Sequence, residues 1–132
     1  MAYALEISDL KKIYPGGTEA LKGISFAVEE GDFYALLGPN GAGKSSTIGI
    51  IGSLVTKTAG KVKIFDIDAD NDLPLAKKML GVVSQEINFS GFEKVINIVV
   101  TQAGFYGIPK SIALPKVEKM LKRLSLWDKR ND

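Results

Sequence analysis

A glycine-rich segment constrains the fold of this chain more than any other part of its sequence. Residues 38–45 read Gly-Pro-Asn-Gly-Ala-Gly-Lys-Ser, which fits the phosphate-loop pattern of a glycine, four residues and Gly-Lys-Ser/Thr. Successive N–H groups in such a turn form a nest for oxyanions, and a following helix adds its positive N-terminal dipole. Gly41 and Gly43 permit positive φ and a close approach that a Cβ would forbid. The segment therefore predicts a binding site for a nucleoside phosphate.

The sequence around the loop has the order strand, loop, helix. Residues 33–37 are a short apolar and aromatic run that ends at the loop, which predicts a buried strand. Ile48, Ile51 and Val55 recur at helical spacing beyond the loop. This order is the structural setting in which a phosphate loop works.

Two side chains of the loop carry the expected chemistry. Lys44 would bring its ammonium to the β- and γ-phosphates, and the Ser45 hydroxyl would ligate Mg²⁺. The alternative is a glycine-rich turn before an ordinary helix, in which Lys44 is a solvated charge and Ser45 a helix N-terminal serine. The flanking strand and helix patterns favour the phosphate site.

The composition limits which ligands and partners the chain can have. The chain has 132 residues, which suits one domain with a core, and its net charge of +2 gives nucleic-acid binding no electrostatic support. It has no cysteine and no histidine, which excludes thiolate metal sites and imidazole acid–base chemistry. Residues 1–6 lack the features of a secretory signal, and the apolar residues 95–100 are too few to span a bilayer. We expect a soluble chain that reaches a membrane only through a partner.

The alternation of apolar and polar side chains predicts strands in the N-terminal part of the chain. Residues 3–8 and 24–28 alternate apolar and polar side chains, which predicts an antiparallel β layer before the loop. Beyond the loop we expect a strand over 61–65, a short helix over 73–80 and a buried strand over 81–84.

The C-terminal part of the sequence reads as helical. Residues 93–105 favour a helix, although their β-branched side chains leave a strand over 95–100 open. A second helix with Pro115 near its first turn has one apolar face, made of Ala113, Val117, Met120, Leu121 and Leu124. We expect Phe105 and Trp127 to pack against helices rather than to contact a ligand.

Several segments carry a family resemblance. Residues 35–46 are nearly a Walker A motif with its preceding strand, and 80–86 are similar to a strand that ends in a Q-loop. Further matching segments are residues 10–14, 20–26, 30–33 and 58–62. Together they resemble the nucleotide-binding domain of ABC transporters, in particular the ATPase subunits of the ABC-2 export type.

The resemblance implies an α/β fold. This would be a P-loop NTPase core of the ABC ATPase type, with an N-terminal antiparallel β layer and the start of a helical subdomain. Residues 1–90 would hold the ATP-binding core and the β layer, and 91–132 the start of the helical subdomain. The sequence stops where the family's signature motif would begin, and the Walker B aspartate, catalytic glutamate and switch histidine are not found in it. We expect the truncated N-terminal half of one nucleotide-binding domain.

The resemblance also implies residue roles. Tyr14 would stack on adenine, the alternative being a strand aromatic beside a Pro-Gly turn. Gln85 would share Mg²⁺ with Ser45 and, together with Lys44, support catalysis; the alternative is a polar residue that ends a buried strand. The remaining nucleotide contacts would come from Gly38, Pro39, Asn40, Gly41, Ala42, Gly43, Lys44, Ser45 and Ser46.

One acidic segment offers a competing interpretation. Asp66, Asp68, Asp70 and Asp72 alternate, but the glycine and glutamate that an EF-hand calcium loop needs are missing at the required spacing. We therefore expect a solvated loop.

The expected partners follow from the same resemblance. They are ATP with Mg²⁺, a second nucleotide-binding domain and a transmembrane permease, which would put the whole protein in the cytoplasm at the inner face of the membrane, where it powers export. The 132 residues alone should bind ATP weakly, hydrolyse almost none and self-associate through open sheet edges. The alternatives are an ABC-type ATPase outside transport, an ATP-sensing module without turnover, and a small-metabolite P-loop kinase, which the long β layer before the loop disfavours.

Overall fold

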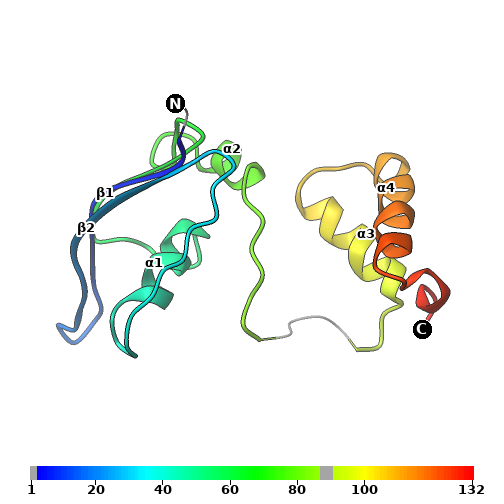
Figure 1. Cartoon of the computed structure of the whole chain (residues 1–132), viewed down its shortest axis with the longest axis horizontal. Coiled ribbons are helices and arrows are strands. Elements are labelled where there is room, and N and C mark those ends of the chain that lie inside the picture. The colour runs from blue at the N-terminus through cyan, green and yellow to red at the C-terminus, as the bar shows by residue number, and fades with distance from the viewer. Residues whose placement is uncertain (1–2, 87–90) are drawn as a thin grey trace. The chain divides into compact units, whose positions relative to one another are not determined.

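The computed structural model describes residues 3–86 and 91–132, and its chain contacts form two compact units. The first unit ends at Val82 and the second begins at Val83, so each is described by itself. Figure 1 draws both units with their elements labelled. The domain boundary predicted between residues 90 and 91 borders a segment outside the described residues and stays a prediction.

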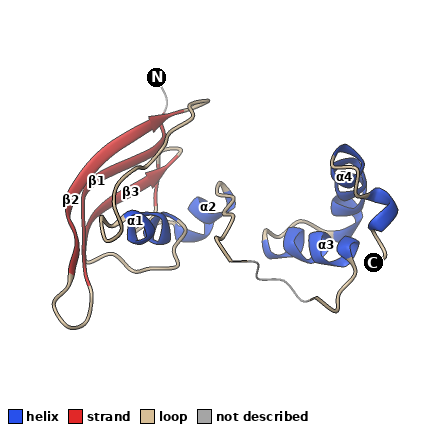
Figure 2. Cartoon of the chain, turned by 60° about the horizontal axis from the view of Figure 1, so that its bottom comes forward, coloured by secondary structure: helices blue, strands red, loops and turns tan. Residues whose placement is uncertain are grey.

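The first unit is built on an antiparallel sheet (Figure 2). Its strands are β1 (Tyr3–Ile13), β2 (Glu19–Glu29), β3 (Ala59–Ile64) and β4 (Ile67–Asp68), in the spatial order β2-β1-β3-β4. Every pairing is antiparallel. The β layer predicted from alternating side chains is therefore confirmed, with strands longer than the alternation indicated.

Strand β1 contains a bulge that changes which side chains face inward. One extra residue of β1 lies between Ile7 and Leu10 relative to β2, and the register against β3 shifts in the same region. Asp9 has φ 48° at this point, and its N–H donates to Ser25 Oγ at 2.8 Å. Ile7 and Leu10 are consequently both buried although they lie three residues apart along the strand. Beyond the bulge, the even-numbered residues of β1 share the face of Leu10.

Helix α1 (Lys44–Ile51) follows the loop directly, as predicted. It begins at Lys44, with Gly43 as its N-cap, and buries Ile50, while Ile48, which the spacing assigned to the inward face, is exposed. The core between the sheet and the helices α1 and α2 consists of Ile7, Leu10, Leu21, Ile50, Val62, Ile64 and Ala76.

Helix α2 (Leu73–Lys78) confirms the short helix expected here. Asp72 is its N-cap, and its carboxylate accepts a hydrogen bond from Leu75 N at 3.1 Å. Pro74 lies in the first turn, where a missing N–H costs nothing because that group has no intrahelical partner.

The two buried strands predicted at residues 33–37 and 81–84 are wrong. Neither segment is a strand, and Phe33 and Val83 are 99% and 98% exposed. Among the described residues, only β1 to β4 form the sheet, and none of them pairs with either segment. An apolar run of this kind becomes a buried strand only when neighbouring strands supply hydrogen bonds on both sides.

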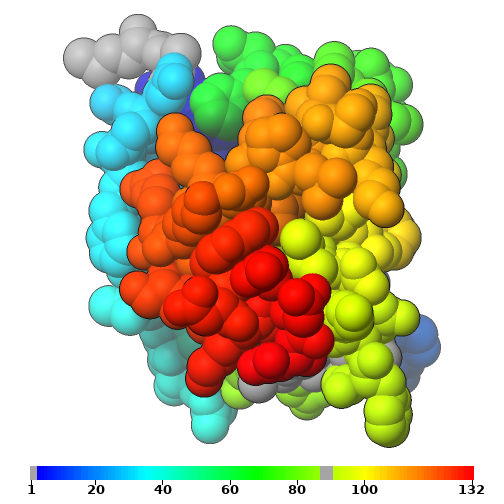
Figure 3. All heavy atoms as spheres, turned by 90° about the vertical axis from the view of Figure 1, so that its right-hand side faces the viewer, coloured from blue at the N-terminus to red at the C-terminus, as the bar shows by residue number. Residues whose placement is uncertain are grey.

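The second unit contains the helices α3 (Val95–Phe105) and α4 (Lys110–Arg123), which pack against each other, and a short 3₁₀ helix at Trp127–Lys129. The yellow atoms of the α3 segment adjoin the orange to red atoms of the α4 segment in Figure 3. Residues 95–100 are therefore helical, which confirms the helix that the sequence favoured over a strand at this segment. Instead of a side-chain cap, the first amides of α3 donate to backbone carbonyls, Val95 N to Asp132 O at 3.2 Å and Ile96 N to Arg130 O at 3.0 Å.

The predicted apolar face of α4 is confirmed for its central residues only. Ala113, Val117 and Leu121 are buried, whereas Met120 and Leu124 are exposed, and Pro115 lies in the second turn rather than the first. The ring of Trp127 packs between cations, with Lys122 Nζ 5.3 Å and Arg130 Cζ 4.6 Å from its centroid. Phe105 is exposed among the described residues, so the prediction that it packs against a helix is wrong.

Candidate functional site

The phosphate loop of residues 38–45 has the backbone of an anion nest. Gly41 and Gly43 both have φ 83°, the left-handed conformation that glycine adopts without strain. A Cβ on Gly43 would lie 2.5 Å from Leu21 Cδ2 and 2.6 Å from the Ala20 carbonyl oxygen, whereas one on Gly41 would meet open space. The loop is therefore seated against β2 at Gly43 and open to solvent at Gly41.

The loop and the start of α1 present free hydrogen-bond donors. Within the described residues, the amides of Gly41, Gly43 and Ser45 donate no hydrogen bond, and α1 has no side-chain cap and no acidic residue in its first turn. Unpaired amides at a helix N-terminus bind anions through hydrogen bonds and the helix dipole. This part of the chain fits a nucleotide phosphate.

Lys44 lies over the mouth of the loop. Its Nζ donates to the carbonyl oxygens of Gly38 at 2.5 Å and Pro39 at 2.6 Å. The side chain of Lys44 is thereby folded back onto the backbone of the loop. A phosphate in the nest would meet both the amides and this cation.

Two hydroxyl side chains follow Lys44 in α1 and have different surroundings. Ser45 is exposed, so its oxygen is accessible to a hydrated cation such as Mg²⁺. Thr47 is buried, and both its N–H and its Oγ1–H donate to the Gly43 carbonyl at 2.9 Å. Thr47 anchors the glycine that ends the loop, a role that sequence reasoning missed although a hydroxyl four residues after a loop glycine could have signalled it.

Tyr14 lies beside the start of α1. Its hydroxyl is 3.0 Å from Ser46 Oγ, and both residues are at least half-buried. The structure thus brings together two predicted contact residues that are 32 positions apart in the sequence.

Gln85, the predicted second Mg²⁺ ligand, belongs to the unit that begins at Val83, whereas Ser45 belongs to the first unit. The side chain of Gln85 is exposed. Its pairing with Ser45 at a shared metal stays a prediction.

Three of the four acidic residues in the segment 66–72 have structural partners. Asp68 Oδ1 accepts from Asp70 N at 2.9 Å, Asp70 pairs with Lys57 at 2.9 Å, and Asp72 caps α2. Across residues 3–86 and 91–132, no group of three or more acidic, cysteine or histidine side chains is arranged to hold a metal.

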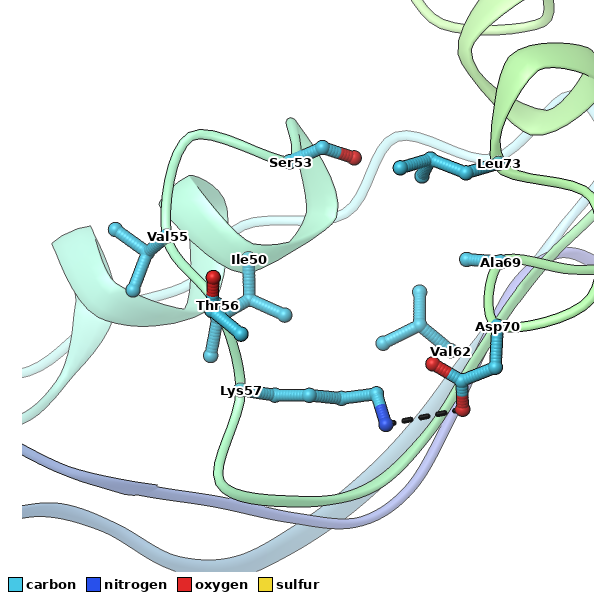
Figure 4. Close-up of a pocket in the computed structure, with 9 residues that line it drawn as sticks. All are labelled: Ile50, Ser53, Val55, Thr56, Lys57, Val62, Ala69, Asp70 and Leu73. Atoms are coloured by element: carbon cyan, nitrogen blue, oxygen red, sulfur yellow. Dashed lines mark ion pairs between the residues drawn. The ribbon is translucent and has the colours of Figure 1, made fainter.

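A separate cavity of about 170 Å³ lies between the end of α1 and the β3–β4 hairpin (Figure 4). Lys57 and Asp70 approach each other across its opening, from the loop after α1 and the loop after β4 (Figure 4). The rest of its lining comes from Ile50, Ser53, Val55, Thr56, Val62, Ala69 and Leu73.

The described helices are too short or too polar to cross a bilayer. The chain matches the family described as ABC transporter over residues 21–132. It is 32% identical over 95% of its length to the macrolide export ATP-binding/permease protein MacB of Aggregatibacter actinomycetemcomitans, of which it covers 21%. It is 40% identical over 62% of its length to the phosphonates import ATP-binding protein PhnC of Alcaligenes faecalis, of which it covers 31%.

The fold is also that of a solved ABC protein. The structure is similar to cbiO1 from Clostridium perfringens, described as part of the ABC transporter complex cbiONQ, with a TM-score of 0.80 and 25% identity. The similarity covers 100% of this chain and 54% of that one. The chain spans less than half the length of the first curated relatives it matches. Since the family match includes the whole phosphate loop and most of the chain, the chain belongs to the ABC transporter ATP-binding family and has the P-loop ABC ATPase fold.

Proposed function

We propose that the chain binds ATP with Mg²⁺ at residues 38–46 and belongs to an ATPase subunit whose ATP hydrolysis powers transport across a membrane. The single observation that carries this proposal is the loop itself, in which the amides of Gly41, Gly43 and Ser45 have no partner among the described residues and the Lys44 ammonium is held on the Gly38 and Pro39 carbonyls. The family membership supports the assignment to transport.

Each residue of the site has a proposed task. The amides of the loop and Lys44 bind the β- and γ-phosphates, Ser45 ligates Mg²⁺, and the ring of Tyr14 stacks on adenine. Gln85 contributes to the same Mg²⁺ or orients the attacking water. The bound Mg²⁺ supplies charge neutralisation at the transferred phosphoryl group.

The proposed partners are a second nucleotide-binding domain and a transmembrane permease subunit, with the complex at the cytoplasmic face of the membrane. In this proposal, residues 1–90 form the ATP-binding core and β layer, and 91–132 begin a helical subdomain. The permease partner is supported by MacB, which is named as an ATP-binding/permease protein, and by cbiO1, which is described as part of an ABC transporter complex.

We further propose export, of the ABC-2 type, as the direction of transport. MacB, with 95% of this chain aligned, is named for export, whereas PhnC, with 62% aligned, is named for import. A strain that lacks the gene should become more sensitive to toxic compounds, and the whole protein should restore resistance while its Lys44→Ala variant should not. Unchanged sensitivity together with lost growth on a scarce nutrient would indicate import instead.

Calorimetry with ATP and Mg²⁺ tests the binding site directly. Lys44→Ala should weaken binding about tenfold or more, because it removes a charge-assisted contact to phosphate. Lys61→Ala, which removes an exposed lysine of β3, is the matched control and should leave the affinity unchanged. Equal affinities in all three proteins would refute the site.

Phosphate release separates binding from turnover. The 132-residue chain should bind ATP yet release almost no phosphate in a malachite-green assay, because phosphoryl transfer to water needs a carboxylate base and an acidic metal ligand, and the amide of Gln85 supplies neither. Robust release that depends on Lys44 would contradict this. Binding without turnover in the whole protein too would favour an ATP-sensing module over a transport ATPase.

A further inference from the structure

The hydrogen bond between Tyr14 and Ser46 joins the two parts of the proposed site. Tyr14 stands at the end of β1, where the base would stack, and Ser46 lies in the first turn of α1, where the phosphates would bind. Their oxygens are 3.0 Å apart, and Ser46 is buried, so water competes poorly for this contact.

The ring of Tyr14 is held in place from the other side. Lys12 Nζ lies 4.8 Å from the ring centroid and donates to the Thr56 carbonyl at 2.7 Å. Thr58 Oγ1 accepts a hydrogen bond from Ile13 N at 2.9 Å. The end of β1 is thus tied both to the start of α1 and to the segment that follows it, and the Lys12 ammonium covers one face of the ring.

The chemistry of a bound phosphate fixes the direction of the Tyr14–Ser46 bond. Either hydroxyl could be the donor in the structure as it stands. The oxygens of a nucleotide phosphate accept hydrogen bonds, so Ser46 must use its single proton to contact them. Tyr14 must then donate to Ser46, and a hydroxyl that accepts such a bond becomes a stronger donor itself.

We propose that Tyr14 is a positioning residue that donates to Ser46 so that Ser46 donates to a phosphate oxygen of the nucleotide, a relay that links the base site to the phosphate site. This inference rests on the proposed function, since it concerns the same nucleotide. It gives the phenol of Tyr14 a role that stacking does not require, because phenylalanine would stack as well.

The relay is tested by calorimetry with two ligands, ATP–Mg²⁺ and tripolyphosphate–Mg²⁺, which has no base. Tyr14→Phe keeps the ring and should lower the affinity for both ligands by the same factor, about fivefold. Tyr14→Ala should lower the affinity for ATP by about a further tenfold, because the ring that stacks on the base is lost. Its affinity for tripolyphosphate should equal that of Tyr14→Phe. Tyr3→Phe, the same chemical change in an exposed tyrosine at the far end of β1, should alter neither affinity.

A double-mutant cycle shows whether Tyr14 acts through Ser46. In a Ser46→Ala background, Tyr14→Phe should have no further effect, whereas Ser46→Thr keeps the hydroxyl and should restore the fivefold effect. Unchanged affinity in Tyr14→Phe, a loss confined to ATP, or an undiminished effect in Ser46→Ala would each overturn the relay. Failure of the unaltered chain to bind either ligand would overturn the proposed function and the relay together, so the two failures are distinguishable.

Discussion

Gly43 lies against Leu21 with no room for a side chain between them, because a Cβ on Gly43 would lie 2.5 Å from Leu21 Cδ2. Gly41 has the same φ of 83° but open space around it. Substituting the two glycines in turn therefore distinguishes the free-energy cost of a strained backbone from that of a steric clash.

Gly43→Ala should therefore be more destabilising than Gly41→Ala. The strain of a left-handed alanine, about 1 kcal/mol, applies to both, and displacement of Leu21 and the Ala20 backbone adds about 1–3 kcal/mol at Gly43 alone. Urea denaturation gives the free energies of unfolding. Equal losses for the two variants would show that the loop moves away from β2 at no cost.

Asp72→Ala should lower the free energy of unfolding by about 1 kcal/mol, because α2 loses the side-chain cap that accepts from Leu75 N. Asp32→Ala removes an exposed carboxylate with no such role and is the matched control. The measurement is again urea denaturation. A loss that is the same in both variants would reflect net charge rather than capping.

The Lys57–Asp70 pair at the opening of the cavity should contribute little by itself. Half of the Asp70 side chain is exposed, which leaves the 2.9 Å contact open to screening, so a double-mutant cycle with Lys57→Met and Asp70→Asn should give a coupling below about 1 kcal/mol. Raising the salt concentration should reduce that coupling further. A coupling that is large and insensitive to salt would contradict this.

The chain should self-associate through its unpaired apolar residues. Phe33 and Leu37 are almost fully exposed in a segment that no described strand pairs with. Light scattering over a wide concentration range should show a rising apparent mass, and Phe33→Ser with Leu37→Ser should reduce it. Leu124→Ser, which removes an exposed apolar side chain after α4 and away from the sheet, serves as a control for loss of apolar area outside this segment. A clean monomer at every concentration would rule the association out.

The sequence predicted the parts of the fold that depend on local patterns. Alternation located β1, β2 and β3, the pattern of residues 73–80 located α2, and the glycine pattern located the loop. Helical spacing was less reliable for burial, since Ile48 and Met120 are exposed although each lies on a predicted inward face. Spacing fixes which residues share a face of a helix, but tertiary contacts decide how much of that face is covered.

The errors at residues 33–37 and 81–84 have a single physical origin. Their apolar composition is that of a strand buried in a parallel sheet, yet burial of such a strand depends on neighbours far away in the sequence. The Tyr14–Ser46 contact escaped sequence reasoning for a similar reason, because 32 residues separate the partners and only the folded sheet brings them together. Thr47 was missed because its partner is a backbone carbonyl, and the only signal in the sequence was its spacing of four residues from Gly43.

The extra residue at Asp9 determines on which side of β1 the later side chains emerge, including Lys12 and Tyr14. Removing or adding one residue between Ser8 and Leu10 would invert that parity and turn Tyr14 away from α1. The turn after Tyr14 carries no such restriction. Insertions and deletions among homologues should therefore occur in that turn and be absent from β1. The length of β1 should be the same in all of them.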